Sequence, residues 1–165
     1  MNSFWSYFWP PFSAGLVVAI IAGAVAFRHR EKRNVALAIG AAASIALAAL
    51  WHGPLGAADR FTGDVEHTIR QALVYNEIPE VSGHLHRGPL TRRVLLSGPA
   101  DDFQRSQLII LMDQVPGVES VSWSGGSGIP LIVEGAVGAV LGFLLGLIVA
   151  YLRELRRRYN AQWNW

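Results

Sequence analysis

Two histidines are the side chains whose spacing could most readily support metal chemistry. His84 and His86 lie two residues apart, so on a strand they point to the same face and could hold a metal together. A third ligand at suitable spacing is not evident, and we expect a solvated strand face. The sequence has no cysteine, which excludes a thiol nucleophile and cysteine-based metal sites. It also lacks Gly-x-Ser-x-Gly, a phosphate-binding glycine loop and His-Glu-x-x-His. No catalytic residue, metal ligand or cofactor-binding residue is therefore predicted.

Glu134 is the single charge in the apolar residues 129–152. A carboxylate inside a membrane is costly and usually functional. If the membrane span starts at Gly135, Glu134 lies at the outer interface, which is the interpretation we favour. A carboxyl group that is protonated or paired against a partner helix is the alternative. His52 follows Ala48 by four residues, a spacing that also occurs where a helix ligates a bacteriochlorophyll, but an interfacial histidine is our expectation.

Three apolar stretches dominate the 165-residue sequence, which is 52% hydrophobic and only 16% charged. Soluble domains average about 25% charged residues, so the composition argues against an ordinary soluble enzyme and against a disordered chain. Residues 11–27 and 35–51 contain no charge, and residues 129–152 contain one. Stretches of 17 to 24 residues span about 26 to 36 Å as helices, against about 30 Å of hydrocarbon. We predict three transmembrane helices. A buried hairpin of core helices is the alternative, but residues 53–128 are too few to cover them.

Basic residues mark the ends of these stretches. Residues 28–33 carry four Lys or Arg and one Glu, and residues 153–165 carry four Arg and one Glu. Residues 53–128 carry six Arg and nine acidic residues, which argues against nucleic-acid binding. Because cytoplasmic loops are rich in Lys and Arg, we place both basic segments in the cytoplasm, and the N-terminus and central segment outside. A cleaved signal peptide is not expected, because the first basic residue, Arg28, follows the apolar run.

Aromatic residues gather at both ends of the sequence. Rings with polar edges favour the headgroup level of a membrane, so we expect interfacial anchors, with docking of a membrane protein or pigment as the alternative. The arginines at residues 156–158 would favour anionic lipid headgroups, although such a run is also a plain topology signal. The predicted interfacial or partner-docking residues are Phe4, Trp5, Tyr7, Trp9, Glu134, Trp163 and Trp165.

Small residues recur every four positions in each apolar stretch, close to one helical turn. Such stripes let helix backbones approach closely where lipid supplies no hydrophobic force. We expect the stripes to pack this chain's own helices together, and contact of at least one stripe with another subunit is the alternative. The predicted packing residues are Gly15, Ala19 and Gly23 in the first stretch, Gly40 and Ser44 in the second, and Gly138, Gly142 and Gly146 in the third.

The central segment alternates between helical and strand periodicity. Asp64 and Asp101 are the expected N-caps of its two helices, Gly88-Pro89 marks a turn, and residues 124–128 read as a flexible linker. The order helix–strand–strand–helix–strand predicts a small α+β sheet with helices on one face. The expected elements are a helix over residues 64–76, strands over 78–86 and 92–97, a helix from Asp101 to residue 115 and a strand over 118–123.

This central segment, residues 59–124, resembles the BON domain (bacterial OsmY and nodulation). The likeness rests on VLLSG at residues 94–98 and on VPGVESV at residues 115–121, which is similar to the family's V-x-G-V-x-x-V ending. Gly88-Pro89-Leu90 and Pro99 depart from the family pattern, so a longer hairpin is expected. The resemblance implies an envelope module that associates with phospholipid or other proteins, without catalysis. The matching motif residues are Gly98, Arg105, Gly117, Val118 and Val121.

Together these features predict a bacterial inner-membrane protein with three transmembrane helices and an extramembrane αββαβ, BON-like domain. The expected order is an aromatic N-terminus (1–10), a first span (11–27), a basic cytoplasmic loop (28–34), a second span (35–52), a periplasmic BON-like domain with linkers (53–128), a third span (129–152) and a cytoplasmic tail (153–165).

We expect a non-catalytic accessory or scaffold subunit that packs onto a larger membrane complex, respiratory or photosynthetic, through its helices and its periplasmic domain. The alternative is an autonomous envelope-maintenance protein that binds phospholipid or self-associates. A transporter or channel is disfavoured, because the spans lack polar pathway residues. The expected partners are membrane lipids and other integral membrane subunits, with a homo-oligomer as an alternative. No cofactor is predicted, and a bound phospholipid is compatible with the resemblance.

Overall fold

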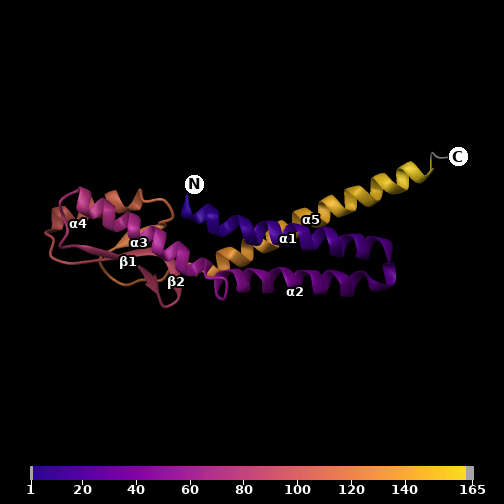
Figure 1. Cartoon of the computed structure of the whole chain (residues 1–165), viewed down its shortest axis with the longest axis horizontal. Helices are drawn as coiled ribbons and strands as arrows, with labels where there is room; N and C mark the ends of the chain where they lie inside the picture. The colour runs from indigo at the N-terminus through magenta and orange to yellow at the C-terminus, as the bar shows by residue number, and fades with distance from the viewer. Residues whose placement is uncertain (1, 163–165) are drawn as a thin grey trace. The chain divides into compact units, whose positions relative to one another are not determined.

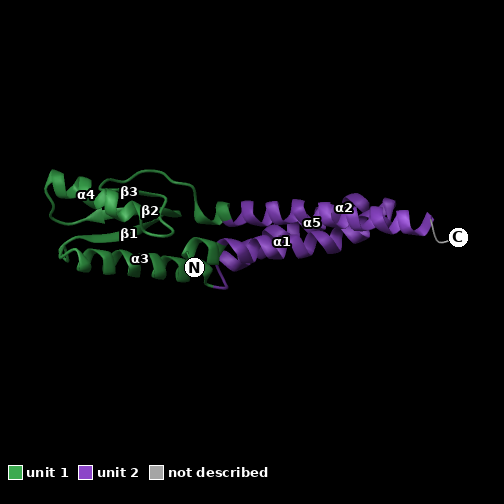
Figure 2. Ribbon diagram, turned by 90° about the horizontal axis from the view of Figure 1, so that it is seen from above, with its two compact units in different colours: residues 1–7, 56–134 green, residues 8–55, 135–165 purple. Residues whose placement is uncertain are grey.

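The computed structural model describes residues 2–162. The chain forms two compact units, residues 1–7 with 56–134 and residues 8–55 with 135–165 (Figure 2). The elements in chain order (Figure 1) are α1 Ser3–Arg28, the short 3-10 helix η1 Arg30–Lys32, α2 Arg33–His52, α3 Ala57–Tyr75, β1 Ser82–Arg87, β2 Leu90–Ser97, α4 Asp102–Asp113, β3 Ser120–Ser122 and α5 Leu131–Gln162.

Three helices among the described residues are long and apolar enough to cross a membrane. Their most apolar segments have mean hydropathies of 2.0 in α1, 1.9 in α2 with η1 and 2.3 in α5. The prediction of three helices of membrane-spanning length is therefore confirmed. α1 starts at Ser3 and contains Pro10 and Pro11, so the aromatic residues before the prolines are helical and continuous with the first apolar stretch.

Glycines bring α1 and α5 into backbone contact within the helical unit. A Cβ atom added at Gly142 would overlap the Phe12 carbonyl, and one added at Gly146 would overlap the Leu16 carbonyl. Each step of four residues along α5 matches a step of four along α1, so the two helices run parallel. Only glycine permits this approach, because any side chain would force the backbones apart.

The third helix of this unit, α2, packs on the other two through its own small residues. A Cβ atom at Gly40 would lie 2.7 Å from the Cβ of Ala22 and 3.0 Å from the ring of Phe143. The buried Ser44 hydroxyl donates to the Gly40 carbonyl at 2.9 Å, so no polar group is left unsatisfied there. The eight residues predicted for helix packing are all buried inside this unit, namely Gly15, Ala19, Gly23, Gly40, Ser44, Gly138, Gly142 and Gly146.

The other unit has the predicted order of helix, strand, strand, helix and strand. Its sheet has the order β1-β2-β3. β1 and β2 pair antiparallel, and β2 and β3 pair parallel. Figure 1 shows α3 and α4 on the same side of the strands. Val94 and Leu96 of β2 are buried, and a Cβ atom at Gly83 of β1 would lie 2.8 Å from Ile69 of α3. The core thus lies between the sheet and the two helices.

The starts of the two helices in this unit differ in how well they were predicted. Asp101 caps α4 through a capping box with Gln104, as expected. The prediction of Asp64 as a cap is wrong, because α3 begins at Ala57 after Gly56, whose φ is 69°. The reason is that the buried residues of α3 recur every four positions, and Ala57 and Phe61 extend this buried face toward the N-terminus. The free energy gained by burying them outweighs a local capping preference.

Candidate functional site

A charged and aromatic junction lies where β2 meets the first turns of α1 and α5. Arg92 of β2 donates through Nε to both carboxylate oxygens of Glu134, at 3.0 and 2.8 Å. The Arg92 guanidinium carbon lies 4.4 Å from the ring centroid of Phe4, and Glu119 is a more distant partner at 3.9 Å. The Arg92 and Glu134 side chains are only 20% and 13% exposed. The arginine is therefore held by a carboxylate and by an aromatic face at once.

A buried tyrosine completes this junction. The Tyr7 hydroxyl donates to the Leu131 carbonyl at 3.2 Å, and the Tyr7 ring lies 6.0 Å from that of Phe61 on α3. Tyr7 is 3% exposed and Leu131 is fully buried. Since a buried phenol needs a hydrogen-bond partner, this contact fixes the first turn of α1 against the first turn of α5.

The segment before α5 is held against β2. Thr91 and Pro130 form an isolated β-bridge. Arg93 donates to the Ser122 hydroxyl at 3.1 Å and to the Ser127 carbonyl at 3.2 Å. Residues 124–128, the predicted flexible linker, form no helix or strand and are exposed. The Arg93 side chain contacts this segment at the Ser127 carbonyl, and the flexibility of the linker stays a prediction.

The charged side chains of the junction pair with one another. Both Glu134 oxygens accept from Arg92, so the carboxylate is already satisfied. Among the described residues, no buried side-chain nitrogen or oxygen lacks a hydrogen-bond partner. Separating Arg92 from Glu134 is costly in free energy, because it leaves an uncompensated charge that is shielded from water.

The predicted aromatic residues of α1 lie on two different faces. Phe4 and Tyr7 belong to the junction. Trp5 and Trp9 are 44% and 48% exposed. Trp163 and Trp165 lie outside the described residues. The N-terminal aromatic run therefore combines side chains that pack on the sheet unit with side chains that face outward.

The residues that carry the BON resemblance are two glycines at turns, an exposed arginine of α4 and two half-buried valines at β3. Gly98 and Gly117 have φ values of +134° and +102°, a region that favours glycine. Arg105 lies 5.3 Å from the Trp123 ring. Val121 of β3 pairs with Val94 of β2, and the half-buried Val118 precedes β3.

The two histidines of β1 are engaged with neighbouring groups. His84 Nδ1 lies 3.9 Å from Glu66, and His86 Nδ1 lies 3.0 Å from the Pro89 carbonyl oxygen. Within residues 2–162, no three His, Cys, Asp or Glu side chains gather as a metal-binding group. His52 is the last residue of α2.

Sequence reasoning identified Glu134 but missed Arg92. Alternation along β2 could not have found Arg92, because the pairing of β1 with β2 is irregular between Leu90 and Val94 and Thr91 is buried as well as Val94. The available signal was a charged residue between two buried positions, which needs a partner, and Glu134 was the one carboxylate placed in an apolar stretch.

In a comparison with known proteins, no family model, curated protein or solved structure matches the chain.

Proposed function

We propose that this protein is a non-catalytic accessory or scaffold subunit of a membrane complex. In this proposal α1, α2 and α5 cross a bacterial cytoplasmic membrane. The αββαβ unit is a BON-like module on the periplasmic side, where it docks a partner protein, and the basic ends of α1 and α5 lie in the cytoplasm. The arginine-rich segments support this orientation through the positive-inside bias.

The observation that carries the proposal is an exposed apolar pair on α4. Phe103 is 71% exposed and Ile110 is 57% exposed. They lie two helical turns apart, on the side of α4 that faces away from the buried Leu108 and Met112. In a unit that lies outside the membrane, lipid does not cover such side chains. Exposed aromatic and aliphatic pairs are typical anchors of protein interfaces.

The use of charged side chains in the sheet unit also favours a structural role. Glu66 of α3 accepts from Arg87 of β1 at 3.1 and 2.9 Å and from the Leu85 backbone at 3.1 Å. Arg92 is paired with Glu134 in the same way. These ionisable groups connect strands to helices, so their role is structural, and a docking module needs such a rigid framework.

The proposal is tested by isolating the natively expressed protein in mild detergent and measuring its assembly by native mass spectrometry. We expect stoichiometric recovery inside one defined complex, and loss of that complex in the variant Phe103→Glu with Ile110→Glu. The matched control is His67→Glu with Gln71→Glu, which adds the same number of acidic residues to exposed positions of α3 and should leave the complex intact.

Two results would contradict the proposal. Recovery of the wild type only as a monomer or homo-oligomer with bound lipid would favour the autonomous envelope-maintenance alternative. Equal loss of the complex in the α4 double variant and in the α3 control would show that Phe103 and Ile110 do not form the docking site. Circular dichroism of each variant checks that the sheet unit stays folded.

A further inference from the structure

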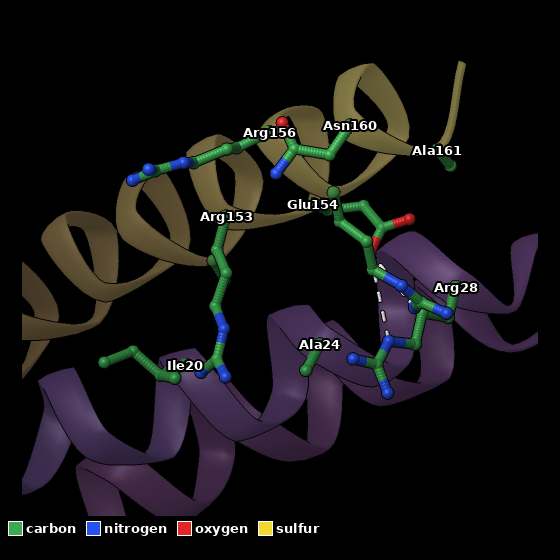
Figure 3. Close-up of a pocket in the computed structure, with 10 residues that line it drawn as sticks. Ile20, Ala24, Arg28, Arg153, Glu154, Arg156, Asn160 and Ala161 are labelled. Atoms are coloured by element: carbon green, nitrogen blue, oxygen red, sulfur yellow. Dashed lines mark ion pairs between the residues drawn. The ribbon is translucent and has the colours of Figure 1, made fainter. Parts of the chain in front are cut away.

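A cavity lined by arginines lies between α1 and α5 inside the helical unit (Figure 3). Its volume is about 530 Å³. Arg28 comes from the last turn of α1. Arg153 comes from α5, and Arg156 and Arg157 follow it one turn later. Among the described residues that line the cavity, Glu154 is the single acidic side chain.

The arginines of this cavity outnumber the carboxylate available to them. Glu154 lies 3.9 Å from Arg28 and 3.7 Å from Arg157, and it also accepts from Arg158 at 3.1 Å. Within residues 2–162, neither Arg153 nor Arg156 forms an ion pair. The cavity therefore has an excess of positive charge that an anionic ligand would balance.

The opposite side of the same cavity is apolar. Ile20 and Ala24 of α1 and Ala150 of α5 line it. Figure 3 shows the Arg153 side chain extending from α5 toward Ile20 of α1, so cationic and aliphatic groups face one space. A free phosphate would use only the arginines. A phospholipid would use both kinds of surface, with its phosphate on the arginines and an acyl chain along Ile20 and Ala24.

We propose that this cavity binds an anionic phospholipid, with the lipid phosphate held by Arg153, whose side chain crosses the space toward α1. Arg156, whose side chain extends along α5 away from Arg153 (Figure 3), adds positive charge at the border of the site. Basic pockets between membrane helices on the cytoplasmic side suit such headgroups. Arg28 and Arg157, partly neutralised by Glu154, line the same space. The inference rests on the membrane insertion in the proposed function, but it needs no partner protein and no docking at α4.

The test uses the purified full-length protein in a non-ionic detergent, titrated with phosphatidylglycerol and followed by native mass spectrometry. We expect binding of phosphatidylglycerol in preference to phosphatidylcholine. The variant Arg153→Gln with Arg156→Gln should weaken phosphatidylglycerol binding by roughly tenfold or more, since each basic side chain adds to anionic lipid affinity. The control variant Lys32→Gln with Arg70→Gln removes the same charge from exposed positions that line neither this cavity nor the neighbouring cavity beside Arg30 and Arg33, and it should bind as the wild type does.

Three results would overturn the lipid site. The first is equal weakening of phosphatidylglycerol binding in the Arg153/Arg156 double variant and in the control variant, which would indicate attraction by the overall positive charge. The second is equal binding of phosphatidylcholine. The third is full displacement of phosphatidylglycerol by an equal concentration of inorganic phosphate, which would indicate a plain anion site. Because the assay contains only this chain in detergent, its failure is distinguishable from failure to find a partner complex. Thermal unfolding of each variant checks that the helices remain packed.

Discussion

Arg92 and Glu134 lie 42 residues apart in the sequence, and Arg92 Nε contacts both oxygens of the Glu134 carboxylate, at 3.0 and 2.8 Å. One residue belongs to β2 and the other to the first turn of α5. The ion pair therefore ties the strand to the start of the helix, and its small exposure makes it sensitive to loss of either partner.

We predict that Arg92→Met lowers the free energy of unfolding by about 3 kcal/mol, because it leaves the shielded Glu134 carboxylate without a partner. Glu134→Met should be destabilising for the converse reason. The double variant Arg92→Met with Glu134→Met should recover most of the loss, since no unpaired charge remains. Unfolding of the full chain by titration with a denaturing detergent measures all three.

The control for this cycle is Glu119→Gln. Glu119 lies 3.9 Å from Arg92 and its side chain is 38% exposed, so its removal should cost less than about 1 kcal/mol. Additive effects of the two single substitutions at Arg92 and Glu134, with no coupling, would show that the ion pair does not hold β2 to α5.

A second prediction concerns the contact between α1 and α5. Gly142→Leu should destabilise the helical unit by about 1–3 kcal/mol or more, because a side chain there would overlap the Phe12 backbone. Val140→Leu is the control, since Val140 lies in the same helix and is 42% exposed. Detergent-induced unfolding monitored by circular dichroism compares the two variants. A tolerated Gly142→Leu would contradict the close packing of the helices.

A third prediction concerns the turn after β2. Gly98→Ala should cost about 1–3 kcal/mol, because Gly98 has a φ of +134° and an added Cβ would lie 2.6 Å from the Glu80 carbonyl oxygen. Gly63→Ala is the matched control: Gly63 is in α3 with no atom near the added Cβ, so alanine should be neutral or stabilising there. Thermal unfolding of both variants gives the comparison, and equal melting temperatures would contradict the requirement for glycine at Gly98.

Local patterns in the sequence predicted the order of the helices and strands of this protein, but they did not predict the junction between β2, α1 and α5. The apolar stretches predicted three long helices, and Asp101 with Gln104 marked the start of α4, because hydropathy and capping act over a few residues. The start of α3 and the contact of residues 124–128 with β2 depend on residues distant in sequence, such as Arg93 with Ser127. Glu134 stood out as a charge in an apolar stretch, whereas Arg92 did not stand out, and only the fold brings the two together.

The proposed arrangement of the chain across a membrane underlies both the proposed docking module and the proposed lipid site. The sequence has no native cysteine, so a single introduced thiol reports its own location. Ser82→Cys places that thiol on β1 of the sheet unit, and Ala161→Cys places it near the end of α5, at two exposed positions.

Labelling of these two variants with a membrane-impermeant maleimide, before and after permeabilisation of the cytoplasmic membrane, tests the account most directly. We predict that Ser82→Cys reacts while that membrane is intact and that Ala161→Cys reacts only after permeabilisation. Reaction of both thiols under the same condition, or protection of Ser82→Cys until permeabilisation, would contradict the proposed topology.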